Sequence, residues 1–207
     1  MEFQTDTSSL FGYLAGCMHI IGFSIYNRKI FTGVIQPIKA TLALWAFIAT
    51  LNALSFSDLS QDFTKAFISI IASVACILTF LFAWRTAKLE PMSKTEKKVF
   101  AFGILAVLVW TIWKQSSYAN VVLQFAVLLS FLPLYKNLWM HPTSEHWLPW
   151  IFWVSAYVCL FTSIMLDWTN PWELVYPITN FVLHGIVILL TLRKPSSNSF
   201  VTHEACS

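Results

Sequence analysis

The chain has 207 residues, of which 57% are hydrophobic and only 11% are charged, and its formal net charge is +3. A soluble domain carries about 25% charged residues, so this composition excludes an ordinary soluble protein and predicts a membrane protein. Seven spans of about 20 residues with short loops would use almost the whole chain and leave no room for a soluble catalytic domain. The positive charge then reports membrane topology and not nucleic-acid binding.

Seven apolar stretches predict an all-α integral membrane protein with seven transmembrane helices. In chain order the expected helices cover residues 10–26, 34–56, 64–84, 98–113, 118–139, 147–166 and 172–192. Eleven of the thirteen Lys and Arg residues fall in segments that would share one face of this bundle, and only Lys65 and Lys114 fall on the other. Because basic loops stay in the cytoplasm, we expect an outside N-terminus and a cytoplasmic C-terminus.

The fourth stretch differs from the others because Thr111 is its only small polar side chain. Without it, two groups of three helices remain, and their sequences resemble each other. The first helix of one group ends GFSIYNRK, and the first helix of the other group ends SFLPLYKNLW. In both groups a proline then precedes a tryptophan by eight residues, Pro37 before Trp45 and Pro142 before Trp150. One inserted helix keeps two three-helix units parallel, so we expect two parallel three-helix bundles joined by a linker helix, a 3+1+3 arrangement.

This arrangement divides the chain into five parts. We expect an extracytoplasmic N-terminal tail (1–9), a first three-helix bundle (10–84), a cytoplasmic loop with linker helix four (85–117), a second three-helix bundle (118–192) and a cytoplasmic tail (193–207).

Three segments carry a resemblance to known proteins: FLPLYKNLW (131–139), HPTSEHW (141–147) and QPIKATLALW (36–45). With the expected topology, they resemble the SWEET and PQ-loop transporter families, and a bacterial SWEET-like family in particular. The proline-glutamine pair of PQ-loop proteins is absent, because Leu134 follows Pro133. The resemblance implies sugar transport in a bacterial inner membrane, with hinge prolines in the first two helices of each unit. Here Pro37, Pro133 and Pro149 are the candidates.

The last predicted helix has a polar stripe. Tyr176, Asn180 and His184 are spaced four residues apart and share one helix face. The resemblance implies that an asparagine on the third helix of each unit contacts the substrate. Asn180 matches this position, while the first unit offers serines, of which Ser73 is the candidate. The alternative is that these groups only join neighbouring helices.

Aromatic residues supply the other half of a candidate site. Trp45 and Asn52 share a face of the second helix, and Trp153 and Tyr157 are their counterparts on the sixth, where Trp150 could also serve as an interfacial anchor. Aromatic faces opposite amides suit a sugar ring or another neutral polar solute. No Asp, Glu, Lys or Arg lies in the middle of a predicted span, which also favours a small neutral solute.

Two polar pairs leave their roles open. His19 and His184 sit at similar depth, so they are candidates for a proton relay or haem ligands, or for neutral groups with local hydrogen bonds. Asn120 and Gln124 could line a path or hold helices together.

The sequence predicts no catalytic residue, metal site or cofactor. Expected partners are the lipid bilayer and a small neutral solute, with no nucleic acid, and association with a second copy stays open. The alternatives are a scaffold subunit, a vitamin carrier of the PnuC type and a membrane enzyme, for which the only metal-binding candidates are His141, Glu145 and His146. A carrier and a scaffold make different predictions: the Asn180 face lines a cavity in a carrier and is packed shut in a scaffold.

Overall fold

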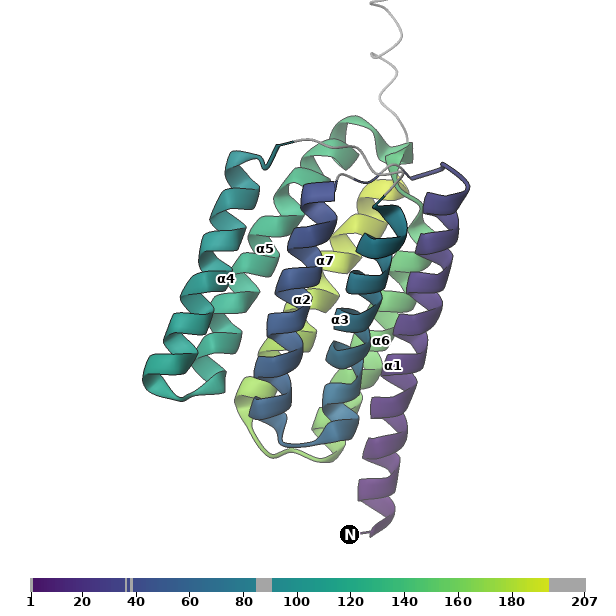
Figure 1. The fold of residues 1–207 in the computed structure, drawn as a ribbon. Helices are drawn as coiled ribbons and strands as arrows, with labels where there is room; N and C mark the ends of the chain where they lie inside the picture. The colour runs from purple at the N-terminus through teal and green to yellow at the C-terminus, as the bar shows by residue number, and fades with distance from the viewer. Residues whose placement is uncertain (1, 36, 38, 85–90, 194–207) are drawn as a thin grey trace, which may run out of the picture.

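The computed structural model describes residues 2–35, 37, 39–84 and 91–193, with side chains from residue 6 onward. All regular secondary structure in these residues is helical (Figure 1). The α-helices are α1 (Glu2–Phe31), α2 (Lys39–Ser60), α3 (Phe63–Ala83), α4 (Lys94–Trp113), α5 (Ser116–Met140), α6 (Trp147–Leu166) and α7 (Val175–Thr191), with short 3₁₀ helices η1 (Pro142–Ser144) and η2 (Pro171–Leu174). Each of the seven predicted stretches forms one α-helix, which confirms the all-α fold.

The first helix is longer than expected. It starts at Glu2, so residues 2–9, which were expected to precede the first helix, form the first two turns of α1. The hydroxyl of Ser8 is buried and donates to the Ser163 backbone carbonyl on α6 at 2.9 Å, and the Ser163 hydroxyl donates to the Ser8 carbonyl at 2.9 Å. This reciprocal pair holds the polar start of α1 against α6.

Six of the helices in the described part of the chain are long and apolar enough to cross a membrane, and α4 is the exception. Its first residues include Lys94, Glu96, Lys97 and Lys98, and the apolar part covers only residues 99–113. The early start has a local cause: Ser93 and Glu96 form a reciprocal capping box with the backbone of the first turn. Helix α4 therefore combines a charged first turn with a short apolar body.

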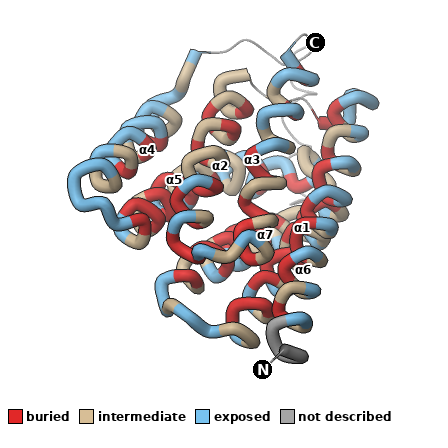
Figure 2. The backbone as a smooth tube through the Cα atoms, turned by 60° about the horizontal axis from the view of Figure 1, so that its bottom comes forward, coloured by how far each residue is buried: buried red, intermediate tan, exposed pale blue. Residues whose placement is uncertain are grey.

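The distribution of polarity is that of a helical membrane protein. Large apolar side chains are exposed on all seven helices, although α2 exposes only Leu54. Polar side chains such as Asn52, Gln124 and Asn180 are buried instead. Figure 2 shows that buried residues face the interior of the bundle and exposed residues its outside. A soluble protein of this size would not expose so much apolar surface, whereas lipid accepts it, and lipid drives polar groups inward.

The helices pack in a regular pattern. In the first group α3 packs against both α1 and α2, and in the second α7 packs against both α5 and α6. The two groups meet where α1 packs on α6 and α2 packs on α5, while α4 packs against α5 and α2. Gly103 makes the α4 contact possible, because a Cβ there would lie 2.6 Å from the ring of Phe47.

The basic residues gather at one end of the bundle, which we call the basic end (top of Figure 1). The helices alternate in direction, so this end contains Arg28, Lys29, Lys39, Lys94, Lys97, Lys98, Lys136 and Arg193. Lys65 and Lys114 belong to the opposite end. Arg85, Lys88 and Lys194 lie outside the described residues.

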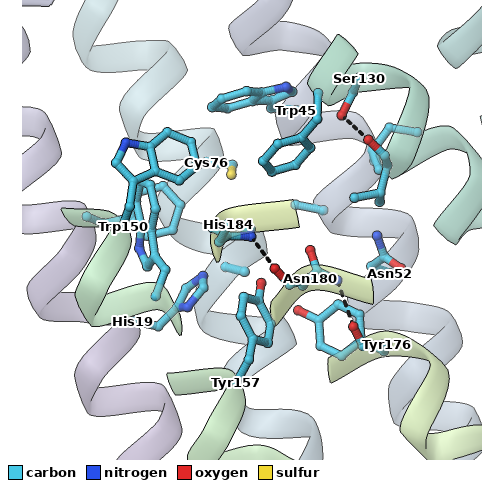
Figure 3. Close-up of a pocket in the computed structure, with 17 residues that line it drawn as sticks. His19, Trp45, Asn52, Cys76, Ser130, Trp150, Tyr157, Tyr176, Asn180 and His184 are labelled. Carbon is cyan, nitrogen blue, oxygen red and sulfur yellow. Dashed lines mark hydrogen bonds between the residues drawn. The ribbon is translucent and has the colours of Figure 1, made fainter. Parts of the chain in front are cut away.

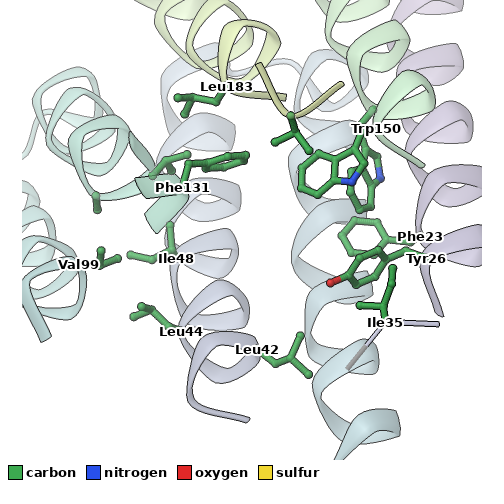
Figure 4. Close-up of a cluster of buried hydrophobic side chains, with 14 of the residues drawn as sticks. Phe23, Tyr26, Ile35, Leu42, Leu44, Ile48, Val99, Phe131, Trp150 and Leu183 are labelled. Atoms are coloured by element: carbon green, nitrogen blue, oxygen red, sulfur yellow. The ribbon is translucent and has the colours of Figure 1, made fainter. Parts of the chain in front are cut away.

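The apolar core consists of two clusters. The larger one lies towards the basic end and includes Phe23, Leu44 and Phe131 (Figure 4). The smaller one lies towards the opposite end and includes Phe56 and Leu160. The candidate site described next has walls from both clusters.

Candidate functional site

A cavity of about 100 Å³ lies in the centre of the bundle (Figure 3). All helices except α4 contribute to its wall, so both groups of three helices enclose it. More than half of the lining side chains are aromatic: His19, Phe23, Trp45, Phe131, Trp150, Trp153, Tyr157, Tyr176 and His184.

The structure brings together seven of the eight side chains predicted to bind solute. The seven that line the cavity are Trp45, Asn52, Trp153, Tyr157, Tyr176, Asn180 and His184. Ser73 is not among the lining residues. Its hydroxyl forms a 2.9 Å hydrogen bond with the hydroxyl of Thr50, so it joins α3 to α2.

The lining residues that the sequence did not single out are mainly apolar, such as Ile48, Ala72, Val127 and Phe131. In an apolar helix, the sequence does not indicate which neighbouring helix or cavity a given apolar side chain contacts. Only the placement of the helices shows which of these side chains face the cavity.

The polar wall of the cavity contains two amides, Asn52 and Asn180, which are joined through Gln124. The Asn180 side-chain NH₂ donates to the Gln124 carbonyl oxygen at 3.3 Å, and the Gln124 NH₂ donates to Asn52 Oδ1 at 2.9 Å. Asn180 also donates to the Tyr176 backbone carbonyl at 2.9 Å, which fixes its orientation. One layer further, Asn120 donates to the Ser55 hydroxyl at 3.3 Å. Asn120 and Gln124 therefore join α5 to its neighbours and lie outside the cavity lining.

The opposite wall is an aromatic cluster around the two histidines. Trp150 and Trp153 meet edge to face, with ring centroids 4.9 Å apart. The His184 ring lies 5.3 Å from Trp150 and 5.2 Å from Tyr157, and His184 Nδ1 lies 2.7 Å from the Asn180 carbonyl. His19 lies 5.7 Å from Tyr157, and its Nδ1 is buried without a hydrogen-bond partner. Trp150 is only 1% exposed, so it is not an interfacial anchor.

The opposite end of the bundle is closed by a buried ion pair. Lys65 Nζ lies 3.3 Å from Glu173 Oε2 and 3.4 Å from Asp167 Oδ2, and Lys65 and Glu173 are both fully buried. The ammonium group also donates to the Asp167 backbone carbonyl at 2.6 Å, and the Thr169 hydroxyl donates to Glu173 at 2.7 Å. The sequence placed Lys65, Asp167 and Glu173 in outer loops or at span ends. The structure joins them across the two helix groups.

A second, larger cavity of about 440 Å³ lies between the first and the basic end, and we call it the vestibule. Trp45 and Ser130 line both cavities, so the two spaces adjoin. The ring of Trp45 stacks on Phe131 with a centroid separation of 6.4 Å. In the described part of the chain, the side chains at this border are therefore mainly aromatic.

The predicted hinge prolines lie in three different settings. Pro37 and Pro133 line the vestibule, and Pro133 lies inside α5, where it removes one backbone hydrogen bond. Pro149 is buried in the first turn of α6. A backbone N–H has no helical partner in a first turn, so Pro149 breaks no bond of the helix.

Glu145 is the least expected residue of the vestibule. It follows η1, and its Oε2 is buried with no hydrogen-bond partner. The hydrogen bond from the Asn137 side chain to the Ser144 hydroxyl, 2.9 Å long, holds the preceding turn in place. Burial raises the pKa of Glu145 to about 7, and the Trp150 side chain opposes this shift.

No group of three His, Cys, Asp or Glu residues in the described part of the chain could hold a metal ion, and His141, Glu145 and His146 form no such group. No protein-family model, curated protein or solved structure matches this chain. The resemblance to the SWEET and PQ-loop families therefore stays a hypothesis that rests on the residues and the helix arrangement.

Proposed function

We propose that this protein is a carrier for a small neutral polar solute such as a sugar. It works by alternating access between two parallel three-helix units, α1–α3 and α5–α7, and α4 links them. The basic end faces the cytoplasm, and the protein is similar in plan to SWEET transporters.

The packing pattern supports two equivalent units. Pairing α1 with α5, α2 with α6 and α3 with α7 converts each contact within the first unit into a contact within the second. The same pairing converts the α1–α6 contact into the α5–α2 contact. Units related in this way rotate against each other about a site at their interface, which is the principle of repeat-built transporters.

The observation that carries the proposal is the surroundings of Asn180. A scaffold protein would pack this face shut, whereas Asn180 lines a central cavity that adjoins the vestibule. The described lining of the central cavity contains no Asp, Glu, Lys or Arg. Aromatic rings on one side and an oriented amide chain on the other suit a neutral ring with polar edges.

The two ends of the bundle differ as alternating access requires. The ion pair of Lys65 with Glu173 and the ring contact of Phe56 with Tyr176, 5.0 Å between centroids, close the opposite end. The vestibule lies on the other side of the cavity. This arrangement corresponds to a state that is closed to the outside.

Solute counterflow in proteoliposomes tests the proposal. The panel contains neutral sugars, polyols, nucleosides and vitamins. Asn180→Ala removes an amide from the cavity wall and should reduce counterflow of the transported solute at least tenfold. Thr162→Ala is the matched control, because Thr162 is a partly exposed residue of α6 outside the cavity lining, and its hydroxyl donates to the Val158 carbonyl of its own helix.

Counterflow of one solute that Asn180→Ala abolishes and Thr162→Ala preserves would support a carrier with its site on α7. Equal flux in both variants would refute the proposed site. No flux for the whole panel would favour a scaffold subunit instead.

A further inference from the structure

Glu145 lies beside a wall of the central cavity but is not part of that cavity. Its carboxyl group lines the vestibule, and the side chain of Trp150 on α6 is close enough to lower the pKa of this group. Trp150 lines the central cavity, and its indole nitrogen, like Glu145 Oε2, is buried without a hydrogen-bond partner. Trp150 therefore connects a carboxyl group on the vestibule side with the His184 ring on the cavity side.

The charged and titratable groups around Glu145 do not neutralise it. Every ion pair among the described residues involves Lys65, at the opposite end. On α1, Tyr26 interacts electrostatically with Glu145, and Lys29 interacts electrostatically with the neighbouring His146.

Two other charged groups at the basic end, Glu96 and Arg193, have partners of their own. Across the vestibule, Glu96 of α4 accepts hydrogen bonds from Thr41 and from the Ser93 backbone. From the end of α7, Arg193 donates to the Trp139 backbone carbonyl. From α5, Asn137 is bonded to Ser144.

A buried carboxylate without a cation partner is costly, and the simplest relief is to bind a proton. The pKa of Glu145, raised by burial to about 7, places this exchange near neutral pH. The vestibule gives the group access to water at the basic end.

We propose that Glu145 is a proton-binding site whose protonation is coupled through Trp150 to the occupancy of the central cavity, so that solute and proton move together. A proton from water in the vestibule forms an O–H bond with a carboxylate oxygen of Glu145. When that O–H bond breaks, the proton returns to water. The second half of this proposal rests on the proposed carrier function. Since coupling is reciprocal, the bound solute then changes the proton affinity of Glu145 as much as the proton changes solute affinity.

The proton site can be tested without knowledge of the solute. The indole N–H resonances of the full-length protein, labelled with ¹⁵N in nanodiscs, are followed from about pH 5 to about pH 9, and Trp150→Phe assigns the Trp150 signal. We expect this signal to titrate with a midpoint near pH 7. In Glu145→Gln the chemical shift of the Trp150 signal should not change with pH. Glu96→Gln, which changes the other vestibule carboxyl group, should leave the titration of the Trp150 signal intact.

A Trp150 signal that does not move with pH, or that titrates equally in Glu145→Gln, would overturn the proton site. Coupling is then tested in proteoliposomes with any solute found by counterflow. A proton gradient should drive its accumulation in the wild type, while Glu145→Gln keeps counterflow and loses accumulation.

The outcomes separate the two proposals. A titrating Trp150 signal without transport of any solute would leave the proton site standing and remove the carrier function. Counterflow without accumulation in the wild type would keep the carrier and refute the coupling.

Discussion

The buried ion pair between the two helix groups makes a sharp prediction about stability. Lys65→Met removes the ammonium group and leaves the fully buried Glu173 carboxylate with only the Thr169 hydroxyl as a donor among the described residues. Loss of one partner of a buried pair costs about 3–5 kcal/mol. Asp167, the second carboxylate beside Lys65, reduces this loss of stability only slightly, because its side chain is 40% exposed and stays solvated. We therefore expect Lys65→Met to lower the free energy of unfolding by about 3 kcal/mol.

Glu173→Gln should cost less than Lys65→Met. The Lys65 ammonium group keeps the Asp167 carbonyl at 2.6 Å and the Asp167 carboxylate at 3.4 Å as partners. A loss of about 1–2 kcal/mol is expected, near the value of one hydrogen bond to a charged group. The double variant should be more stable than the sum of the two losses predicts, because it leaves no unpaired charge.

Reversible unfolding in mixed detergent micelles, followed by circular dichroism, measures these three differences. Asp58→Asn serves as the control, because Asp58 is an exposed acidic residue near the same end of the bundle. Equal losses for the two single variants, or additive losses in the double variant, would refute the argument that an unpaired buried charge dominates.

Three further predictions follow from local geometry. Gly22→Ala should lower the melting temperature and the flux, because the new Cβ would lie 2.5 Å from the Trp153 indole nitrogen. Overpacking of this kind costs about 1–3 kcal/mol. Gly185→Ala is the control and should change neither quantity, because no atom lies within 4 Å of its Cβ position. Asn52→Ala should lower the free energy of unfolding by about 0.6–1.7 kcal/mol, the usual size of a hydrogen bond between membrane helices, measured by the same unfolding assay. Because the folded pKa of Glu145 is raised from the model-compound value of 4.5 to about 7, the folded state binds the proton more tightly than the unfolded state. The wild type should therefore lose about 3 kcal/mol of stability between about pH 4.5 and pH 7, and Glu145→Gln should flatten this profile; a wild-type profile equally flat would contradict the reasoning.

The helices could be predicted because apolar runs and basic loops are local signals. The seven expected stretches overlap the seven α-helices, and the ends of α3, α5 and α6 agree within two residues. The start of α1 was missed because polar residues before residue 10 look like a solvated tail. The hydrogen bonds between Ser8 and Ser163, which are 155 positions apart in the sequence, hold that segment against α6.

The polar stripe of the site could be predicted as well, since Tyr176, Asn180 and His184 repeat at helical spacing on one element. Ser73 could not be placed, because serines occur on several faces of the helix. Its hydrogen bond with Thr50, which turns the hydroxyl towards α2, is visible only in the structure. Lys65 was placed at the outer end of the third predicted helix, and its burial was not expected because lysine is seldom buried. Its burial depends on Asp62, which caps α3 and starts the helix before Lys65, and on Glu173, which is 108 positions away.

Trp45 gives the two adjoining cavities a common boundary. Its ring is partly buried, and it stands where the wide vestibule meets the narrow central space. In the proposed carrier, a solute that moves between them passes this indole group, which turns about two side-chain bonds and needs no displacement of a helix. Passage at this point would be a fast local event on the timescale of side-chain rotation, whereas exposure to the far side would require the slower separation of the buried ion pair. The proposed carrier would thus have two barriers of different kinds in series: one selects by size, and the other sets the turnover rate.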